Sequence, residues 1–196
     1  MKKLFSELRS AIMLTLALAV VCCGIYPLAV YGVAQIAFRS QANGSLIVGQ
    51  DGTIHGSRLL GQSFTAEEYF HSRPSAAGNG YDATSSGGSN LGPTSQKLND
   101  AIKQNIADYR TQNQLATNAL VPADAVTASA SGLDPHISLR NAELQTPRVA
   151  KARSLGEDRV RELIRANIDG ADLGFFGEPG VNVLQLNLAL DALTSK

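Results

Sequence analysis

The most prominent pattern in the sequence is one long apolar stretch near the N-terminus. No charged residue occurs between Arg9 and Arg39, and residues 11–38 read AIMLTLALAVVCCGIYPLAVYGVAQIAF. As a helix with about 1.5 Å of rise per residue, this interval would measure roughly 42 Å. The hydrocarbon core of a bilayer is only about 30 Å thick. We therefore predict a transmembrane helix over residues 11–38.

Two other kinds of segment share this composition, namely a cleaved signal peptide and a buried core helix of a soluble protein. Hydrophobic residues continue through Val33 and Ile36, beyond the length of a signal-peptide core, and no clear cleavage site follows. A lipoprotein would carry a small residue before its modified cysteine, whereas Cys22 follows a valine. These features favour a retained anchor.

The charges at the N-terminus predict how the anchor is oriented. Lys2, Lys3 and Arg9 precede the apolar stretch and are opposed only by Glu7. Positively charged flanks stay in the cytoplasm. We expect residues 1–10 to be a short cytoplasmic N-terminus and residues 39–196 to form a soluble extracytoplasmic domain.

Three residues within the predicted span are candidates for contact with a partner in the membrane. Gly24 and Gly32 would let another helix approach closely, and Pro27 removes a backbone donor and favours a kink. The alternative is that glycine and proline are simply commoner in membrane helices than in soluble ones. Cys22 and Cys23 lie inside the span, where we expect them to serve only as small apolar side chains.

The remainder of the chain predicts an α+β domain without internal repeats. Apolar positions at helical spacing predict helices over residues 95–112, capped by Thr94, over 157–168, stopped by Gly170, and over 187–193. Thr146-Pro147 is expected to begin another helix that ends near Gly156, and residues 65–68 to form one capped helical turn. Strands are expected at residues 45–48 and 53–55, around an Asp-Gly turn, and at 126–129 and 181–186.

A long stretch without predicted helices or strands, residues 72–94, contains a glycine- and serine-rich run. Long loops of this kind are usually functional or disordered. The run could hold an anion through its backbone N–H groups, or it could contact a partner protein. We favour partner contact, and the candidate residues are Ser86, Gly87, Gly88, Ser89 and Asn90.

Charge and motifs argue against several classes of function. Lys plus Arg and Asp plus Glu both number 17, so the formal net charge is zero and nucleic acid is not an expected partner. No phosphate-binding G-x-x-x-x-G-K-[ST] motif occurs. His55, His71 and His136 lack zinc-like spacing to other ligands, so no metal site is expected.

A catalytic triad could be assembled only from residues within one short stretch. Ser129 or Ser131, Asp134 and His136 have the right chemistry, but such close neighbours seldom point at one another, and no G-x-S-x-G elbow is present. The basic run from Arg148 to Arg165 alternates with acidic residues and resembles solvated helix faces. We expect no catalysis by this chain alone.

Six blocks of sequence, in order and over nearly the whole chain, resemble one family. The sequence is similar to KdpC, the family of C subunits of the bacterial Kdp potassium-transporting ATPase. The blocks are QANGSL from Gln41, YFHSRPS from Tyr69, SGGSNL from Ser86, VTASASGLDP from Val126, PRVAKAR from Pro147 and VNVLQLNLALD from Val181.

The resemblance implies an accessory subunit of a high-affinity potassium-uptake complex in the bacterial inner membrane. Its partners would be a channel-like subunit and a P-type subunit that hydrolyses ATP. The family is described as stabilising assembly and as a catalytic chaperone that raises the ATP affinity of the P-type subunit. ATP would then be met only transiently, with no tightly bound cofactor.

The predicted topology conflicts with direct contact between this domain and ATP, because ATP is cytoplasmic and the domain is expected outside. The alternative function is that of a secreted or anchored periplasmic binding or docking protein unrelated to transport.

Overall fold

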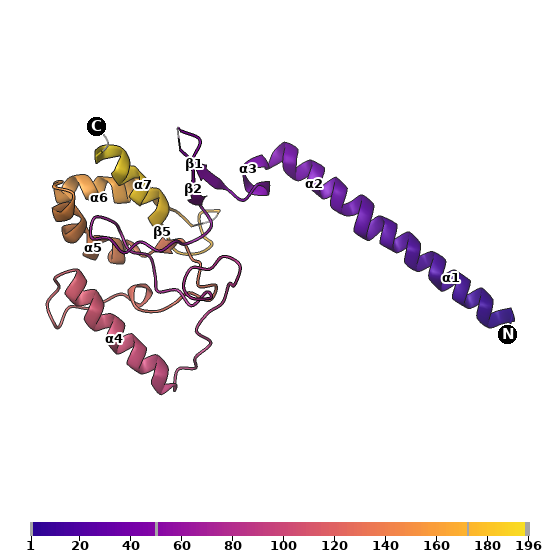
Figure 1. Cartoon of the computed structure of the whole chain (residues 1–196), viewed down its shortest axis with the longest axis horizontal. Helices are drawn as coiled ribbons and strands as arrows, with labels where there is room; N and C mark the ends of the chain where they lie inside the picture. Colours follow the sequence, from indigo (N-terminus) through magenta and orange to yellow (C-terminus); the bar gives the residue numbers. More distant parts are fainter. Residues whose placement is uncertain (1, 50, 172, 195–196) are drawn as a thin grey trace. The chain divides into compact units, whose positions relative to one another are not determined.

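The computed structural model of the chain describes residues 2–49, 51–171 and 173–194. It divides into two compact units, Met1–His55 and Gly56–Lys196. Figure 1 shows a long N-terminal helix and a domain of helices and short strands. This confirms the predicted α+β class of the domain that follows the apolar helix in the sequence.

The first unit is dominated by a continuous apolar helix. It consists of α1 (Lys2–Ala19), a π-helical turn η1 (Val20–Ile25) and α2 (Tyr26–Ala37). The helix therefore begins well before the predicted start of the span. After it come α3 (Arg39–Ala42) and the strands β1 (Leu46–Val48) and β2 (Ile54–Ser57), which pair as the sequence predicts.

The π-helical turn has a local cause in the sequence. Pro27 lies in the first turn of α2 and has no N–H to donate to a carbonyl of the preceding turn. A wider turn at Val20–Ile25 accommodates this missing hydrogen bond without breaking the helix. The expected effect of Pro27 is thus realised as a change of helical winding.

The second unit is built on a three-stranded antiparallel sheet with helices packed on one another and on the central strand. β5 (Gly180–Asn182) lies between β3 (His136–Ile137) and β4 (Ile168–Asp169), with His136 opposite Asn182 and Ile168 opposite Val181. α5 (Leu139–Ala152) packs on α6 (Glu157–Ala166), α6 packs on α7 (Val183–Thr194), and β5 contacts α5 and α7.

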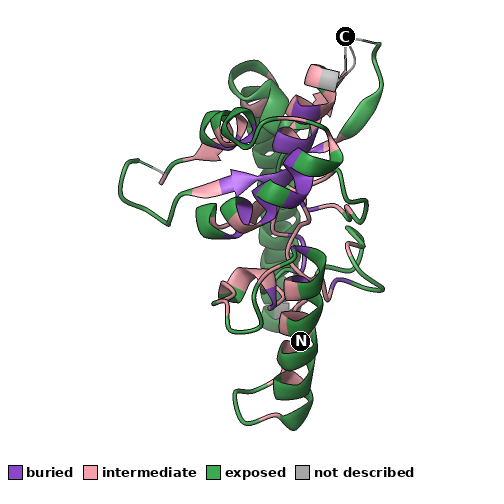
Figure 2. Ribbon diagram, turned by 90° about the vertical axis from the view of Figure 1, so that its left-hand side faces the viewer, coloured by how far each residue is buried: buried purple, intermediate pink, exposed green. Residues whose placement is uncertain are grey.

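The core lies between the sheet and these three helices, where Figure 2 shows the buried residues gathered. Its apolar spacing follows the helical period on α5, α6 and α7. Fully buried members include Phe70, Ile137, Val149, Val160, Ile164, Val181, Leu186 and Leu190.

α4 (Gln96–Gln112) is attached to α5 through the side chain of Tyr109, and its C-cap Asn113 accepts from Arg148 of α5. Tyr109 is buried on α4 and its hydroxyl donates to Asn141 Oδ1 at 2.8 Å. The predicted helix is confirmed, but its cap is Ser95 and not Thr94, since Ser95 Oγ accepts from the Leu98 N–H.

α5 begins earlier than the sequence predicts. Pro147 lies inside this helix, and the cap is Ser138, whose Oγ accepts from the Asn141 N–H at 3.1 Å. Asp124, in the short helix η2 (Ala123–Ala125), accepts from both the N–H and the hydroxyl of Ser138. The tertiary contact with Asp124 thus fixes the start of the helix at Ser138, and not at Thr146-Pro147 as the sequence predicts.

Four further predictions are wrong or need shortening. Residues 126–129 form no strand, because a turn and a bend follow η2 there and the rest is irregular. Residues 65–68 form a hydrogen-bonded turn, Tyr69 N–H to Ala66 C=O, and no helix. The strand at 181–186 ends at Asn182, whose side chain accepts from the Gln185 N–H and so starts α7. α6 ends at Ala166, before Gly170.

Candidate partner-contact surfaces

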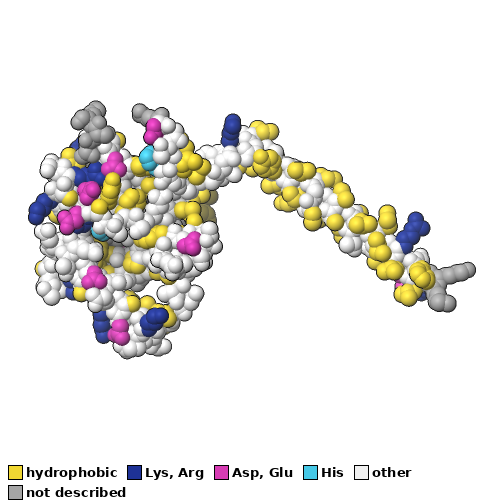
Figure 3. Space-filling view, in the orientation of Figure 1, with side chains coloured by type: hydrophobic (Ala, Val, Ile, Leu, Met, Phe, Trp, Pro, Cys, Tyr) yellow, Lys and Arg dark blue, Asp and Glu magenta, His cyan; other side chains and the backbone are white. Residues whose placement is uncertain are grey.

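The N-terminal helix is the largest apolar surface of the chain. Lys3–Ala37 has a mean hydropathy of 2.3 in its most apolar window and no part of that window is buried. Within the residues that the structure describes, it is the one helix long and apolar enough to cross a membrane. Figure 3 shows hydrophobic side chains along its length. Such a surface is stable only in lipid or against another protein.

The three candidate residues of the span lie on this uncovered surface. A Cβ placed on Gly24 or Gly32 would meet no atom within 4 Å. Pro27 lies next to the π-helical turn, where the helix is locally widened. Close approach by a neighbouring helix is sterically open at these positions, and partner contact there stays a prediction.

The glycine-rich loop is held against a second loop. Ser86 Oγ and the Gly87 N–H both donate to the Ser131 C=O, at 3.0 and 2.9 Å. Gly88 is close to the Ala130 backbone, because a Cβ there would lie 3.0 Å from the Ala130 C=O. Gly88 therefore has a packing role, and Gly87 contributes a backbone hydrogen bond. Ser89 and Asn90 are exposed, so they are the part of the loop free to meet a partner.

The same loop packing depends on Gly132. This residue has φ +68°, and a Cβ would lie 2.6 Å from both the Ala77 nitrogen and the Gly87 carbonyl oxygen. Ser75 Oγ donates to the Gly132 C=O at 2.6 Å and accepts from the Tyr81 N–H at 2.8 Å. Two parts of the stretch 72–94 are thus fixed to the turn at Gly132 by backbone contacts and by the Ser75 hydroxyl.

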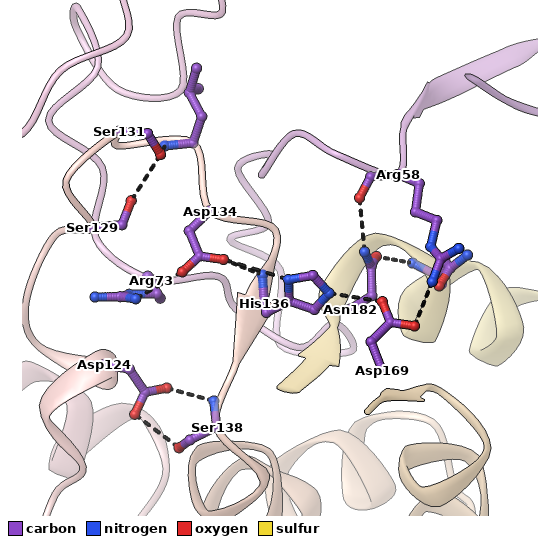
Figure 4. Close-up of polar contacts among 12 residues, drawn as sticks. Arg58, Arg73, Asp124, Ser129, Ser131, Asp134, His136, Ser138, Asp169 and Asn182 are labelled. Atoms are coloured by element: carbon purple, nitrogen blue, oxygen red, sulfur yellow. Dashed lines mark hydrogen bonds and ion pairs between the residues drawn. The ribbon is translucent and has the colours of Figure 1, made fainter. Parts of the chain in front are cut away.

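A polar cluster joins β3 and β4 to the loop after β2 (Figure 4). His136 Nε2 lies 2.8 Å from Asp169 Oδ2, and its Nδ1 lies 3.6 Å from Asp134 Oδ1. Arg58 completes the pairing with Asp169 at 2.6 Å, and its C=O accepts from the Asn182 side chain at 2.9 Å. The cluster ties three segments far apart in sequence.

Electrostatics in this cluster favour a charged histidine. The hydrogen bond with Asp134 raises the pKa of His136 against the opposing effect of burial, and Asp169 adds to the rise. Burial alone would raise the pKa of Asp169, but its hydrogen bonds with His136 and Arg58 lower that pKa below the ordinary value. The arrangement is an ion-pair network.

The structure does not assemble the serine triad considered from the sequence. Both ring nitrogens of His136 face carboxylates, so neither faces a serine (Figure 4). Ser129 and Ser131 instead lie with their hydroxyls 3.4 Å apart, and Ser131 Oγ accepts from the Leu133 N–H. The expectation that these residues do not form a triad is confirmed.

The interpretation of the basic run as solvated helix faces is right for α6 and for Lys151 of α5, which is exposed, and wrong for Arg148. Arg159 pairs with Glu162, and Arg161 with Glu157, on exposed faces. Arg148 is buried, with Nε 3.0 Å from Asn113 Oδ1 and Nη2 2.8 Å from Gln145 Oε1. Its Nη1 donates to two backbone carbonyls, those of Glu67 and Tyr69.

Buried side-chain amides of α5 and α7 hold the segment that begins at Tyr69 through hydrogen bonds to its backbone. Asn187 donates to the Phe70 C=O at 3.0 Å and accepts from its N–H at 2.9 Å. Gln145 makes the same pair of bonds with His71, at 3.1 and 2.7 Å. Burial lowers the pKa of His71, as does the nearby charge of Arg148. The sequence block from Tyr69 therefore has a structural function that neither its spacing nor its composition indicated.

Three hollows lined by described residues each carry at most two basic side chains. One of about 220 Å³ is lined by Asp108 and neutral residues, with no lysine or arginine. A second, of about 510 Å³, has Arg73 as its only basic side chain, and Arg73 is paired with Asp134 at 2.8 Å. A third, of about 200 Å³, is lined by Lys151 and Arg148, but the Arg148 donors are already engaged, and Glu67 adds negative charge.

Among the described residues, no group of three or more His, Cys, Asp or Glu side chains is placed to hold a metal ion.

Comparison with known proteins assigns the family. Residues 8–192 match the family described as "KdpC: K+-transporting ATPase, c chain". The chain belongs to the KdpC family. It is 53% identical over 187 residues to the potassium-transporting ATPase KdpC subunit of Mycobacterium tuberculosis, covering 95% of this chain and 98% of that protein.

Other KdpC subunits show comparable similarity. Identity is 48% over 185 residues with the protein of Koribacter versatilis, covering 94% of each chain. It is 48% over 205 residues with the protein of Rhodopseudomonas palustris, covering 98% of this chain and all of that one. The resemblance found in the sequence is thus confirmed, and the chain is a KdpC-type subunit of a potassium-transporting ATPase with one candidate transmembrane helix.

Proposed function

We propose that this KdpC chain is a non-catalytic accessory subunit of a high-affinity potassium-uptake complex, anchored in the bacterial inner membrane by its N-terminal helix. The observation that carries the proposal is the uncovered apolar helix Lys3–Ala37 in a chain of the KdpC family. An isolated soluble protein could not stabilise this surface in water.

The anchor would place the two ends of the chain on opposite sides of the membrane. Lys3 and Arg9 precede the uncharged span, and positive flanks remain in the cytoplasm. The unit Gly56–Lys196 would then be extracytoplasmic. There it would dock over the external entrance for potassium, with the exposed residues Ser89 and Asn90 among its contacts.

The partners would be the channel-like subunit and the P-type subunit, met by the span around Gly24, Pro27 and Gly32. Both glycines leave room for a neighbouring helix. In this arrangement the chain stabilises assembly of the complex.

The family's chaperone role would then be indirect. Among the described residues, these three hollows are lined by at most two basic side chains each, and ATP is on the other side of the membrane in the proposed topology. We propose that the chain raises the ATP affinity of the P-type subunit through the contacts of assembly, with no phosphate held by its own residues.

Protease treatment of intact spheroplasts tests the topology, using a C-terminally tagged chain followed by immunoblotting. External protease is expected to remove the tag from the membrane fraction. Protection of the tag until lysis would place the domain beside ATP and contradict the topology. A tagged fragment free in the periplasm, lacking the apolar segment, would instead indicate a secreted binding protein.

Copurification tests the partnership. The tagged chain, extracted in mild detergent, is expected to retain both large ATPase subunits. A membrane-anchored chain that retains neither would refute the proposal in favour of a docking protein unrelated to transport.

The double variant Ser89→Asp with Asn90→Asp tests whether the glycine-rich loop contacts a partner, since both side chains are exposed and the neighbouring glycines stay intact. Unchanged yield and potassium affinity would remove the loop from the interface.

A further inference from the structure

The loop between β4 and β5 carries an apolar tip that the proposed function does not use. Leu173, Phe175 and Phe176 are 82%, 70% and 58% exposed, and the two phenylalanine rings lie 4.2 Å apart at their centroids. We call these three residues the apolar tip. Single exposed apolar residues are ordinary on protein surfaces, but a cluster of three large ones marks an interaction site.

The base of this loop is held firmly by the polar cluster. Asp169 at the end of β4 pairs with Arg58 and His136, and it lies opposite Gly180, the first residue of β5. Within the loop, Gly174 and Gly177 both have φ of +83°. The loop therefore turns on residues suited to tight turns, and its two strands are anchored. The ordering cost of presenting the tip is largely met before any partner binds.

The charges near the tip discriminate between the two kinds of surface that could cover it. Glu178 is exposed beside the tip, and the sequence has no lysine or arginine between Arg165 and Lys196. Loops and helices that enter a bilayer surface gain affinity from basic flanking residues, because bacterial and other anionic lipids attract them. An acidic flank lowers affinity for such a surface and suits a protein groove with a basic rim.

We propose that the apolar tip inserts into an extracytoplasmic groove of another subunit of the same ATPase, with an apolar floor for the two phenylalanine rings and a basic rim facing Glu178. This inference rests on the proposed function, because it takes that complex as the source of the groove. Aromatic side chains at the centre of an interface commonly supply most of the binding energy.

Substitution of the tip gives the first test. In the complete complex, Phe175→Ser with Phe176→Ser is expected to lower recovery of the partner subunits with the tagged chain by roughly tenfold or more. The matched control is Leu120→Ser, since Leu120 is 86% exposed on a different loop. Recovery with the control is expected to equal that of the wild type. Both variants are expected to keep the wild-type melting temperature, because the altered side chains are exposed.

Photo-crosslinking identifies the occupant. A benzophenone amino acid at Phe176 in cells that express all subunits is expected to give one adduct with another ATPase subunit, and none when placed at Leu120. Adducts only with a second copy of this chain would overturn the proposal.

A fluorescence measurement tests whether the apolar tip inserts into the lipid bilayer and not into a protein groove. The chain has no tryptophan, so Phe176→Trp is a sole reporter in the full chain reconstituted alone. Quenching of its emission by brominated lipids would overturn the proposal in favour of membrane insertion, whereas absence of quenching supports it.

The outcomes separate this inference from the proposed function. If the wild-type chain retains the ATPase subunits and the double serine variant retains them equally well, the docking inference fails and the proposed function stands. If the wild-type chain retains none of them, both fail.

Discussion

Replacing Arg148 with alanine removes the buried side chain that links α5, the end of α4 and the segment before Phe70. The guanidinium donates to the side-chain oxygens of Asn113 and Gln145 and to the Glu67 and Tyr69 carbonyls. Arg148 is only 7% exposed, so water cannot replace these donors without opening the fold.

The magnitude follows from the acceptors left behind. A buried acceptor without a donor costs about 1–3 kcal/mol. Four acceptors lose a partner, of which Gln145 Oε1 keeps the His71 N–H as a donor. Removing the charge recovers part of the desolvation cost, because burial lowers the pKa of Arg148. We expect Arg148→Ala to lower the free energy of unfolding by about 3–4 kcal/mol, within the range for a broken buried network.

Denaturant unfolding of the full chain in detergent measures this loss. The near-ultraviolet circular dichroism of tyrosine should be followed, since the apolar helix has no tertiary packing to report. Arg148→Lys keeps the charge without the planar fork of donors and is expected to recover only part of the loss. Arg159→Ala, in an exposed pair, should change the free energy by less than about 0.5 kcal/mol. An Arg148→Ala effect no larger than that of Arg159→Ala would refute the reasoning.

Three further predictions concern the other contacts that fix the domain. His136→Asn should be less stable than the wild type at low pH, and the difference should be smaller at high pH. The raised pKa of His136 gives a stabilising contribution that is present below about pH 6.5 and lost as the pH rises through the raised pKa. Equal differences in the free energy of unfolding at pH 5 and pH 9 would contradict this. Gly132→Ala should lower the free energy of unfolding by at least about 2 kcal/mol, from left-handed strain and from backbone clashes; wild-type thermal stability would count against the loop packing. Asn187→Ala should cost about 2–4 kcal/mol, because the buried N–H and C=O of Phe70 both lose their partner; amide exchange at Phe70 as slow as in the wild type would be inconsistent with that role.

Local patterns in the sequence predicted the elements whose stability is itself local. The apolar helix, α4 and α6 follow from composition, helical spacing and charge pairs, as with Arg161 and Glu157. The antiparallel hairpin follows from its Asp-Gly turn.

The sequence could not predict features that depend on contacts between residues far apart in the chain. Thr146-Pro147 has the local features of a helix start, yet Asp124 holds the earlier start at Ser138. Asn182 with Gln185 three residues later was a readable signal for the start of α7, which the alternation of Val181–Leu186 obscured.

The candidate site was predicted in the same uneven way. The apolar helix and the family blocks could be read directly, whereas the pairing of His136 with Asp169 joins residues 33 apart, and no pattern links them. The burial of Arg148 was equally hidden, because its neighbours in sequence are those of a solvated helix.

The π-helical turn at Val20–Ile25 divides the apolar helix into two angular registers. One extra residue in a turn advances every later side chain by about 100° around the axis. A stripe of positions that faces one neighbour along α1 is therefore rotated away from that neighbour along α2. A single straight helix thus offers differently directed faces in its two halves, and a tryptophan scan through it should show a periodic response whose phase jumps at the turn.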